Sequence, residues 1–164
     1  MKKILAFLLA AVLGTGSGLG LSLAFQVMQV EDNSMLPTYE YGEKTLVSRF
    51  SYAGDRKPVR GDVVLIPNIV YAVTGENGIM MKRIVAVGGD RVMITGGKVY
   101  VNNRELEEEY VFSQDTGGEM DEVRVPVGKV FVLGDNRTSS TDSRSEFVGL
   151  PDESEILGKV IFKW

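Results

Sequence analysis

The sequence predicts a mostly β domain that follows one N-terminal transmembrane helix. Two observations predict this arrangement. An uncharged run at the N-terminus, residues 4–30, is followed by short β-branched segments that alternate with turns. Outside the N-terminal run, no long stretch has the apolar spacing of a helix, so we expect the body to coil into a barrel or a sandwich-like pair of sheets.

The N-terminal segment has the length and charge pattern of a membrane anchor. Residues 4–25 are almost wholly apolar or small, and about 20 helical residues cross a hydrocarbon core of about 30 Å. Lys2 and Lys3 precede the run, which favours a cytoplasmic N-terminus and an extracytoplasmic body. We therefore expect residues 1–28 to anchor a single-pass protein in the lipid bilayer of the cell membrane, and residues 29–164 to form the domain outside.

A cleaved secretory signal is the alternative, because Ser22-Leu23-Ala24 resembles a small-x-small cleavage site. The apolar run is longer than the roughly 7 to 15 residues usual in such signals, which favours a retained anchor. Both alternatives export the domain. Gly14 and Gly18, and likewise Gly16 and Gly20, form overlapping GxxxG spacings, which leave self-association of the helix open.

Several segments of the body have the composition of strands, with β-branched residues between turn formers. They are residues 45–50, 62–66, 79–87, 91–95, 98–101, 122–125, 130–133 and 157–163. Gly96-Gly97 is expected to join two of them as a tight hairpin. Pro151 and the acidic residues after it are typical of the start of a helical turn.

Composition excludes several kinds of site. The chain has no cysteine and no histidine, which excludes disulfides, thiol catalysis and the usual zinc ligands, and any nucleophile needs a base other than imidazole. A metal held by carboxylates alone stays open, although no calcium-loop pattern is present. The net charge of −4 gives no electrostatic reason to bind nucleic acid. The acidic run at residues 104–122 is expected to be a solvated loop.

The stretch GIMMKRIVAVGGD, residues 78–90, contains a candidate base. Side chains alternate in a strand, so Lys82 and Arg83 point to opposite faces, and one of them is expected to be partly buried. Burial lowers the pKa of a lysine, and a neutral lysine is a base. Lys82 is therefore a candidate base for Ser34, in EDNSMLPTYEYG at residues 31–42. The alternatives are a lysine that protects a sheet edge and an ordinary turn serine.

A third stretch, GDNRTSSTDSR at residues 134–144, follows a predicted strand and combines hydroxyl, carboxylate and guanidinium groups. Asp142 and Arg144 are either a surface ion pair of little energetic value or a pair that braces a site. In the second case a serine hydroxyl would orient the lysine amine. A nucleophile, a base and an orienting group together form the general arrangement of an activated serine.

These stretches resemble the bacterial type I signal peptidases of the compact serine–lysine type. The motifs NSMLPT, RGDVV, KRIVAVGGD and GDNRTSSTDSR occur in the family's order after one apolar segment, and the resemblance covers most of the chain. It implies a coiled antiparallel β-sheet catalytic core. It also implies a membrane-anchored serine endopeptidase that needs no cofactor and cleaves signal peptides from exported preproteins through an acyl-enzyme.

The resemblance implies a role for each motif residue. Ser34 corresponds to the nucleophile and Lys82 to the general base. Ser140 corresponds to a serine that hydrogen-bonds the lysine, and Asp142 and Arg144 to a supporting ion pair. The substrate is expected to add as an extended strand, with small side chains in shallow apolar pockets. The expected pocket walls are Val30, Met81 and Ile84.

One position departs from the family pattern. Some members carry a hydroxyl residue two positions before the nucleophile, where it helps to hold the oxyanion, but this chain has Asp32, which cannot donate when it is ionised. The loss of one such donor costs a factor of roughly 10² to 10³ in rate. The backbone N–H of Ser34 is then the expected donor, and no side chain is assigned to that role.

Two other classes of protein share some of these features. A self-cleaving repressor-type protease also uses serine and lysine, but it needs a DNA-binding module where this chain has an apolar segment. A non-catalytic exported β domain that binds a partner would carry Ser34 and Lys82 incidentally. Labelling by a serine-directed acylating inhibitor would separate these classes, because only an activated Ser34 reacts.

Overall fold

The computed structural model describes residues 24–67 and 78–164. Nearly all its regular structure is extended. The strands are β1 (Phe25–Gln29), β2 (Lys44–Ser48), β3 (Val63–Pro67), β4 (Ile79–Val87), β5 (Arg91–Thr95), β6 (Lys98–Val101), β7 (Arg104–Glu105), β8 (Met120–Arg124), β9 (Val130–Leu133) and β10 (Gly158–Lys163). Two short 3-10 turns, η1 (Arg137–Ser139) and η2 (Glu153–Glu155), accompany them.

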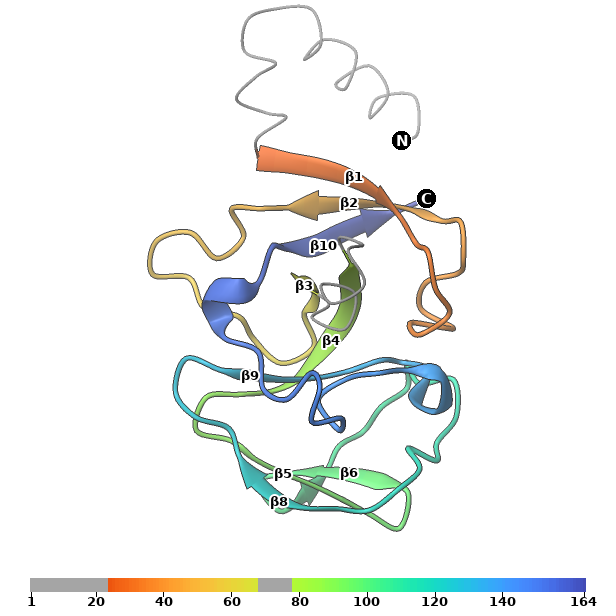
Figure 1. Ribbon diagram of the computed structural model, residues 1–164, viewed down its shortest axis with the longest axis vertical. Helices are drawn as coiled ribbons and strands as arrows, with labels where there is room; N and C mark the ends of the chain where they lie inside the picture. The colour runs from red at the N-terminus through yellow and green to blue at the C-terminus, as the bar shows by residue number, and fades with distance from the viewer. Residues whose placement is uncertain (1–23, 68–77) are drawn as a thin grey trace, which may run out of the picture.

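The strands form two antiparallel sheets, which confirms the predicted mostly β fold. The larger sheet has the order β1-β2-β10-β3-β4-β9 and the smaller one the order β7-β6-β5-β8. Figure 1 shows β1, β2 and β10 at one end of the long axis and β5, β6 and β8 at the other. Gly96 and Gly97 have φ of 58° and 74°, as the predicted two-residue hairpin between β5 and β6 requires.

Each predicted strand is present, and β4, β5, β6 and β9 have the predicted bounds. Strands β1 and β7 were not predicted. All of β1 except Gln29 was assigned to the anchor, because Phe25-Gln26-Val27-Met28 continues the apolar run without a charge. In the structure these residues pair with β2, opposite Thr45–Ser48. β7 is only two residues long and has polar side chains, so it carries no strand pattern.

Most of the expected anchor, residues 1–23, lies outside the described residues. Among the described residues, 24–67 and 78–164, no helix has the length and apolar character needed to cross a membrane.

Strand β4 contributes to three apolar clusters. Met81 packs in a cluster with Val30 and Met35, whereas Ile84 packs in another with Val64. Ala86 packs in a third, where β9 of the larger sheet meets β5 and β6 of the smaller one. The pairing of β4 with β9 shifts between Ile84 and Ala86, so a bulge interrupts the alternation that the sequence predicted for the whole strand. Side chains of β4 thereby stabilise both sheets.

The acidic segment is not solvated throughout, contrary to the prediction. Glu108 and Thr116 are buried against Arg137, which is also buried. Arg137 Nη1 donates to Glu108 Oε2 at 2.8 Å and to Thr116 Oγ1 at 2.7 Å, and its Nε donates to the carbonyl oxygen of Gly134 at 2.9 Å. The partner of Glu108 therefore lies 29 positions along the chain, and no local pattern in the sequence indicates it.

We expect Glu108→Ala to destabilise the domain strongly, because it would leave the Arg137 guanidinium buried without its carboxylate. Removing one partner of a buried ion pair costs about 3–5 kcal/mol. Urea unfolding measures this change in the free energy of unfolding. Glu107→Ala is the matched control, since the side chain of Glu107 is exposed, and should stay within about 0.5 kcal/mol of the parent. Equal effects of the two changes would show that the buried pair contributes nothing.

Candidate active site

Ser34 lies in a tight turn between β1 and β2. The N–H of Leu36 donates to the carbonyl oxygen of Asn33 at 3.3 Å, and that of Tyr39 donates to the carbonyl oxygen of Met35 at 2.9 Å. Met35 is fully buried and packs with Tyr39 in one apolar cluster. Apolar burial of Met35 and Tyr39 therefore helps to fix the turn that carries Ser34.

Lys82 reaches this turn from the middle of β4. Its Nζ lies 2.7 Å from Ser34 Oγ and donates to the carbonyl oxygen of Met81 at 3.1 Å. Ser34 is 4% exposed and Lys82 is 2% exposed. A side chain as long as lysine is seldom buried to this degree unless its charge is paired. Lys82 forms no ion pair with any described residue, so an amine in this position is better accommodated without its charge.

Burial lowers the pKa of the Lys82 amine, because the charged ammonium loses its hydration. The carboxylates of Asp32, Asp142 and Asp135 act in the opposite direction, and the guanidinium of Arg144 lowers the pKa further. Two of the carboxylates are neutralised by arginines, Asp142 by Arg144 and Asp135 by Arg83. Asp32 forms no ion pair with any of the described residues.

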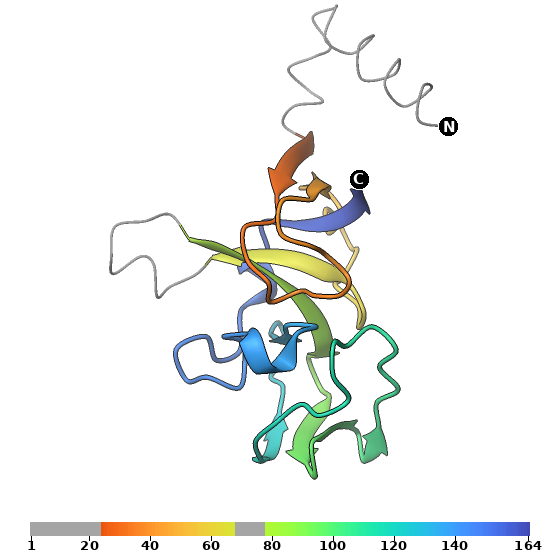
Figure 2. The same ribbon diagram turned by 90° about the vertical axis from the view of Figure 1, so that its right-hand side faces the viewer.

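The segment after β9 closes over the serine turn. The backbone N–H of Asn136 donates to the carbonyl oxygen of Ser34 at 2.9 Å, and its Nδ2 donates to the carbonyl oxygen of Asn33 at 3.0 Å. A Cβ on Gly134 would lie 2.6 Å from the carbonyl oxygen of Ser34 and would also overlap Ser140. The two segments thus approach more closely than any side chain at position 134 allows. Figure 2 shows the turn after β1 beside the loop that contains η1.

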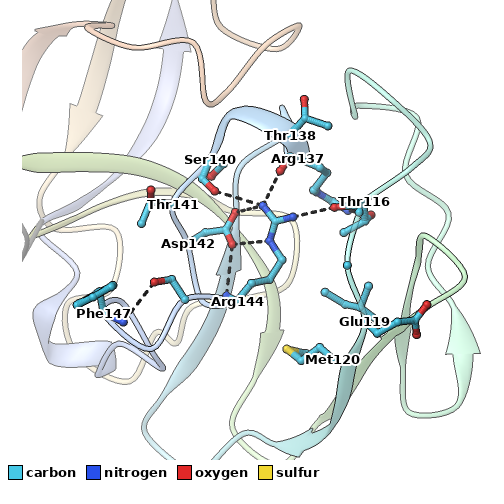
Figure 3. Close-up of a pocket in the computed structure, with 14 residues that line it drawn as sticks. Thr116, Glu119, Met120, Arg137, Thr138, Ser140, Thr141, Asp142, Arg144 and Phe147 are labelled. Carbon is cyan, nitrogen blue, oxygen red and sulfur yellow. Dashed lines mark hydrogen bonds and ion pairs between the residues drawn. The ribbon is translucent and has the colours of Figure 1, made fainter.

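Asp142 and Arg144 form a brace within this loop, with Asp142 buried and Arg144 partly buried. Arg144 Nε and Nη2 each donate to the Asp142 carboxylate at 2.8 Å, and Asp142 also accepts from the N–H of Gly134 at 3.1 Å. Figure 3 shows the Arg144 guanidinium between Asp142, Thr116 and Arg137. Its remaining donors bind the carbonyl oxygens of Thr116 at 2.8 Å and Arg137 at 2.7 Å. The guanidinium therefore ties the loop to the acidic segment.

Ser140 lies beside Gly134, close to the serine turn. Its Oγ is buried and forms no hydrogen bond with any described residue, Lys82 included. The hydrogen bond to Lys82 that the resemblance implies is thus not formed in this structure.

Arg83 binds the other side of the turn. Its Nε and Nη2 donate to the two oxygens of Asp135, at 2.8 and 2.6 Å, and Thr38 Oγ1 also donates to Asp135. The Arg83 guanidinium lies 3.9 Å from the centre of the Tyr110 ring. Adjacent residues of β4 therefore have separate tasks: Lys82 contacts the serine and Arg83 holds the surrounding segments together.

The three expected pocket walls do not lie together. Val30 and Met81 pack in the cluster of Met35, next to Ser34, whereas Ile84 is fully buried in a different cluster. A separate pocket of about 730 Å³ lies beside Arg144 and Phe147, and neither Ser34 nor Lys82 lines it. Among residues 24–67 and 78–164, no group of three or more Asp or Glu side chains has the arrangement of a metal site.

Comparison with known proteins identifies the family. Residues 1–164 match the family described as signal peptidase, peptidase S26. The chain belongs to this family. The resemblance predicted from the motifs is therefore confirmed.

Individual relatives agree with this assignment. Thylakoidal processing peptidase 1 of Arabidopsis thaliana is 38% identical over 141 residues, 82% of this chain and 40% of the relative. Probable signal peptidase I-1 of Synechocystis is 34% identical over 151 residues, 89% of this chain and 76% of the relative. A crystal structure of a signal peptidase I from Enterococcus faecalis V583 has a TM-score of 0.52 and 25% identity, and the match covers 66% of this chain and 100% of that one.

We expect Gly134→Ala to reduce the reactivity of Ser34 by about 10²-fold, because the added Cβ would push the loop away from the serine turn. The rate of acylation by a serine-directed inhibitor measures this effect. Gly88→Ala, just after β4, is the matched control, since its Cβ would also meet neighbouring backbone, at Val127, but away from the serine turn. Equal rates for Gly134→Ala and the control would show that the close approach of the loop to the serine turn does not affect the reactivity of Ser34.

We expect Lys82→Met to stabilise the domain increasingly as the pH falls. The unfolded chain protonates this amine below about pH 10.4, whereas burial lowers its pKa in the fold. Between these two values the unfolded state binds more protons, so the parent loses stability as the pH decreases through the window, and then levels off. Urea unfolding across the window measures the difference, with Lys57→Met at an exposed position as control. A difference that does not vary with pH would exclude a buried neutral amine.

Proposed function

We propose that this chain is a membrane-anchored serine endopeptidase that removes signal peptides from exported preproteins, with Ser34 as nucleophile and Lys82 as general base. The observation that carries the proposal is the distance of 2.7 Å between Lys82 Nζ and Ser34 Oγ, with both side chains buried. Membership of the signal peptidase family supports the substrate class. The lowered pKa of Lys82 supports the role of base.

In the proposed reaction, the neutral amine of Lys82 takes the proton of the Ser34 hydroxyl while Oγ attacks the carbonyl carbon of the scissile peptide bond. The carbon–nitrogen bond then breaks, and the Lys82 ammonium gives its proton to the leaving amine. This leaves an ester between Ser34 and the signal peptide. A water molecule, deprotonated by Lys82, attacks the ester, and the proton returns to Ser34 as the signal peptide leaves. The backbone N–H of Ser34 is the proposed donor to the oxyanion.

The remaining motif residues act by positioning in this proposal. Asp142 and Arg144 hold the loop after β9 against the serine turn, which their mutual hydrogen bonds support. Ser140 orients the Lys82 amine in the substrate complex. Its buried position beside Gly134 and its free hydroxyl support this role, because a rotation about its Cα–Cβ bond would redirect Oγ without moving the backbone.

The proposed substrate is an extended segment with small side chains next to the cleaved bond. Val30 and Met81 are its proposed apolar walls, since both pack in the cluster of Met35 beside the nucleophile. Ile84 is left out of this pocket because it lies in another cluster. No cofactor takes part in the proposed reaction.

We also propose that the N-terminal segment anchors the chain, with its N-terminus in the cytoplasm and the catalytic domain on the extracytoplasmic face. The apolar run and its two preceding lysines support this topology. Ser34 follows β1 closely, so an anchor before β1 would hold the site at the surface of the bilayer, where a membrane-embedded signal peptide presents its cleavage site. The GxxxG spacings would allow two such anchors to pair.

Two variants of the full chain in detergent test the function. With a model preprotein, we expect Ser34→Ala and Lys82→Arg each to reduce kcat/KM by roughly 10³-fold or more. Arginine has nearly the length of lysine but stays protonated, so it cannot serve as a base. Lys98→Arg, at an exposed position at the start of β6, is the matched control and should cleave normally. Near-normal cleavage by Lys82→Arg would refute the assignment of the base.

A further inference from the structure

The backbone N–H of Ser34 is already occupied in the structure. It donates to Asp32 Oδ1 at 2.8 Å. This is the donor that the proposed mechanism assigns to the oxyanion, which must lie about 3 Å from it. A carboxylate oxygen and an oxyanion resemble each other in charge and in hydrogen-bonding geometry. Asp32 Oδ1 therefore occupies the position from which the carbonyl oxygen of a bound peptide would accept the hydrogen bond of the Ser34 N–H.

The same carboxylate acts on the proposed base. Of the groups that raise the pKa of Lys82 against the effect of its burial, Asp32 is the strongest, followed by Asp142 and Asp135. Arg144 lowers this pKa. The other two carboxylates are bound by arginines, so the unpaired carboxylate of Asp32 is the one that is able to leave. Its presence favours the protonated amine, which is the inactive form of the base.

Asp32 is able to turn away without disturbing the nucleophile. Asp32 is exposed, whereas Ser34 is buried and its carbonyl oxygen is held by the N–H of Asn136. The turn is fixed on its other side by Met35, which is fully buried. Rotation of the Asp32 side chain into solvent therefore breaks one hydrogen bond and leaves the backbone of the turn in place.

We propose that Asp32 is an internal competitor of the substrate, whose carboxylate occupies the Ser34 N–H in the free enzyme and yields it to the carbonyl of a bound peptide. The inference rests on the proposed function. It makes Asp32 a determinant of specificity, because only a peptide that binds well enough along the site displaces the carboxylate. Short peptides, which have little binding energy to contribute, are cleaved poorly for this reason.

The hydrogen bond between Asp32 and the Ser34 N–H also has the form of an Asx turn, which would shape the loop and nothing more. The two roles predict opposite results. If Asp32 only shapes the turn, its removal loosens the nucleophile and slows the reaction. If Asp32 competes, its removal frees a donor, speeds the reaction and makes Lys82 easier to deprotonate. The substitution Asp32→Asn separates the two roles, since the side-chain oxygen of asparagine can still accept the hydrogen bond of the turn but carries no charge.

The test uses the full chain in detergent, with a model preprotein and a short peptide that spans the same cleavage site. For Asp32→Ala we expect kcat/KM on the short peptide to rise about tenfold, and kcat/KM on the preprotein to rise less. For both Asp32→Ala and Asp32→Asn we expect the midpoint of the kcat/KM profile against pH to move to lower pH by roughly half a unit or more. Glu31→Gln, which removes the neighbouring exposed carboxylate, should change neither quantity.

The possible failures are distinguishable. If the parent cleaves the preprotein, but the two Asp32 variants have unchanged pH midpoints and are no faster on the short peptide, the competitor role is wrong and the proposed function stands. If Asp32→Ala is slower while Asp32→Asn keeps the parent rate and midpoint, Asp32 serves only to shape the turn. If the parent does not cleave the preprotein, both proposals fail. Thermal unfolding of each variant confirms that the chains compared are folded.

Discussion

The site depends on the burial of one amine. Lys82 places its Nζ beside Ser34 Oγ in a region from which solvent is almost excluded, and burial lowers the pKa of that amine. A chain without histidine has few ways to provide a base near neutral pH, and desolvation of a lysine is one of them. The surrounding structure maintains this burial. The arginines neutralise the nearby carboxylates of Asp135 and Asp142, which would otherwise favour the charged ammonium.

Several charged side chains around the site are buried or partly buried, and each of the following has a defined partner. Arg83 binds Asp135, Arg137 binds Glu108, and Arg144 binds Asp142. Such ion pairs contribute little net stability, because desolvation offsets much of their attraction. Breaking a pair leaves a buried charge without a partner, so few other arrangements of these segments are stable. Here they connect β4, the acidic segment and the loop after β9 to the serine turn. We infer that their main contribution is to fix the geometry of these segments, which come from distant parts of the chain.

Much of the fold could be predicted from the sequence, because β-branched segments between turn formers mark strands such as β4 and β9 locally. β1 was missed because its apolar residues continue the N-terminal run, and the bulge after Ile84 leaves no composition signal. The pairing of Ser34 with Lys82 depended on the order of motifs, since nothing near either residue indicates the other. Long-range polar contacts could not be predicted for the same reason. Neither the burial of Glu108 against Arg137 nor the hydrogen bond from Ser34 to Asp32 follows from residue type.

The position of β10 in the larger sheet has a consequence for when the serine becomes reactive. β10 follows the other described strands in sequence but lies between β2 and β3, so it joins the hairpin that carries Ser34 to β3 and β4, and β4 carries Lys82. During synthesis, Ser34 and Lys82 are therefore made well before the strand that joins their two parts of the sheet. We infer that, before β10 pairs, the Ser34 hydroxyl is unreactive and the Lys82 amine is solvated and charged. On the proposed function, the order of the strands delays activity until the fold is complete, as a removable propeptide does in other proteases.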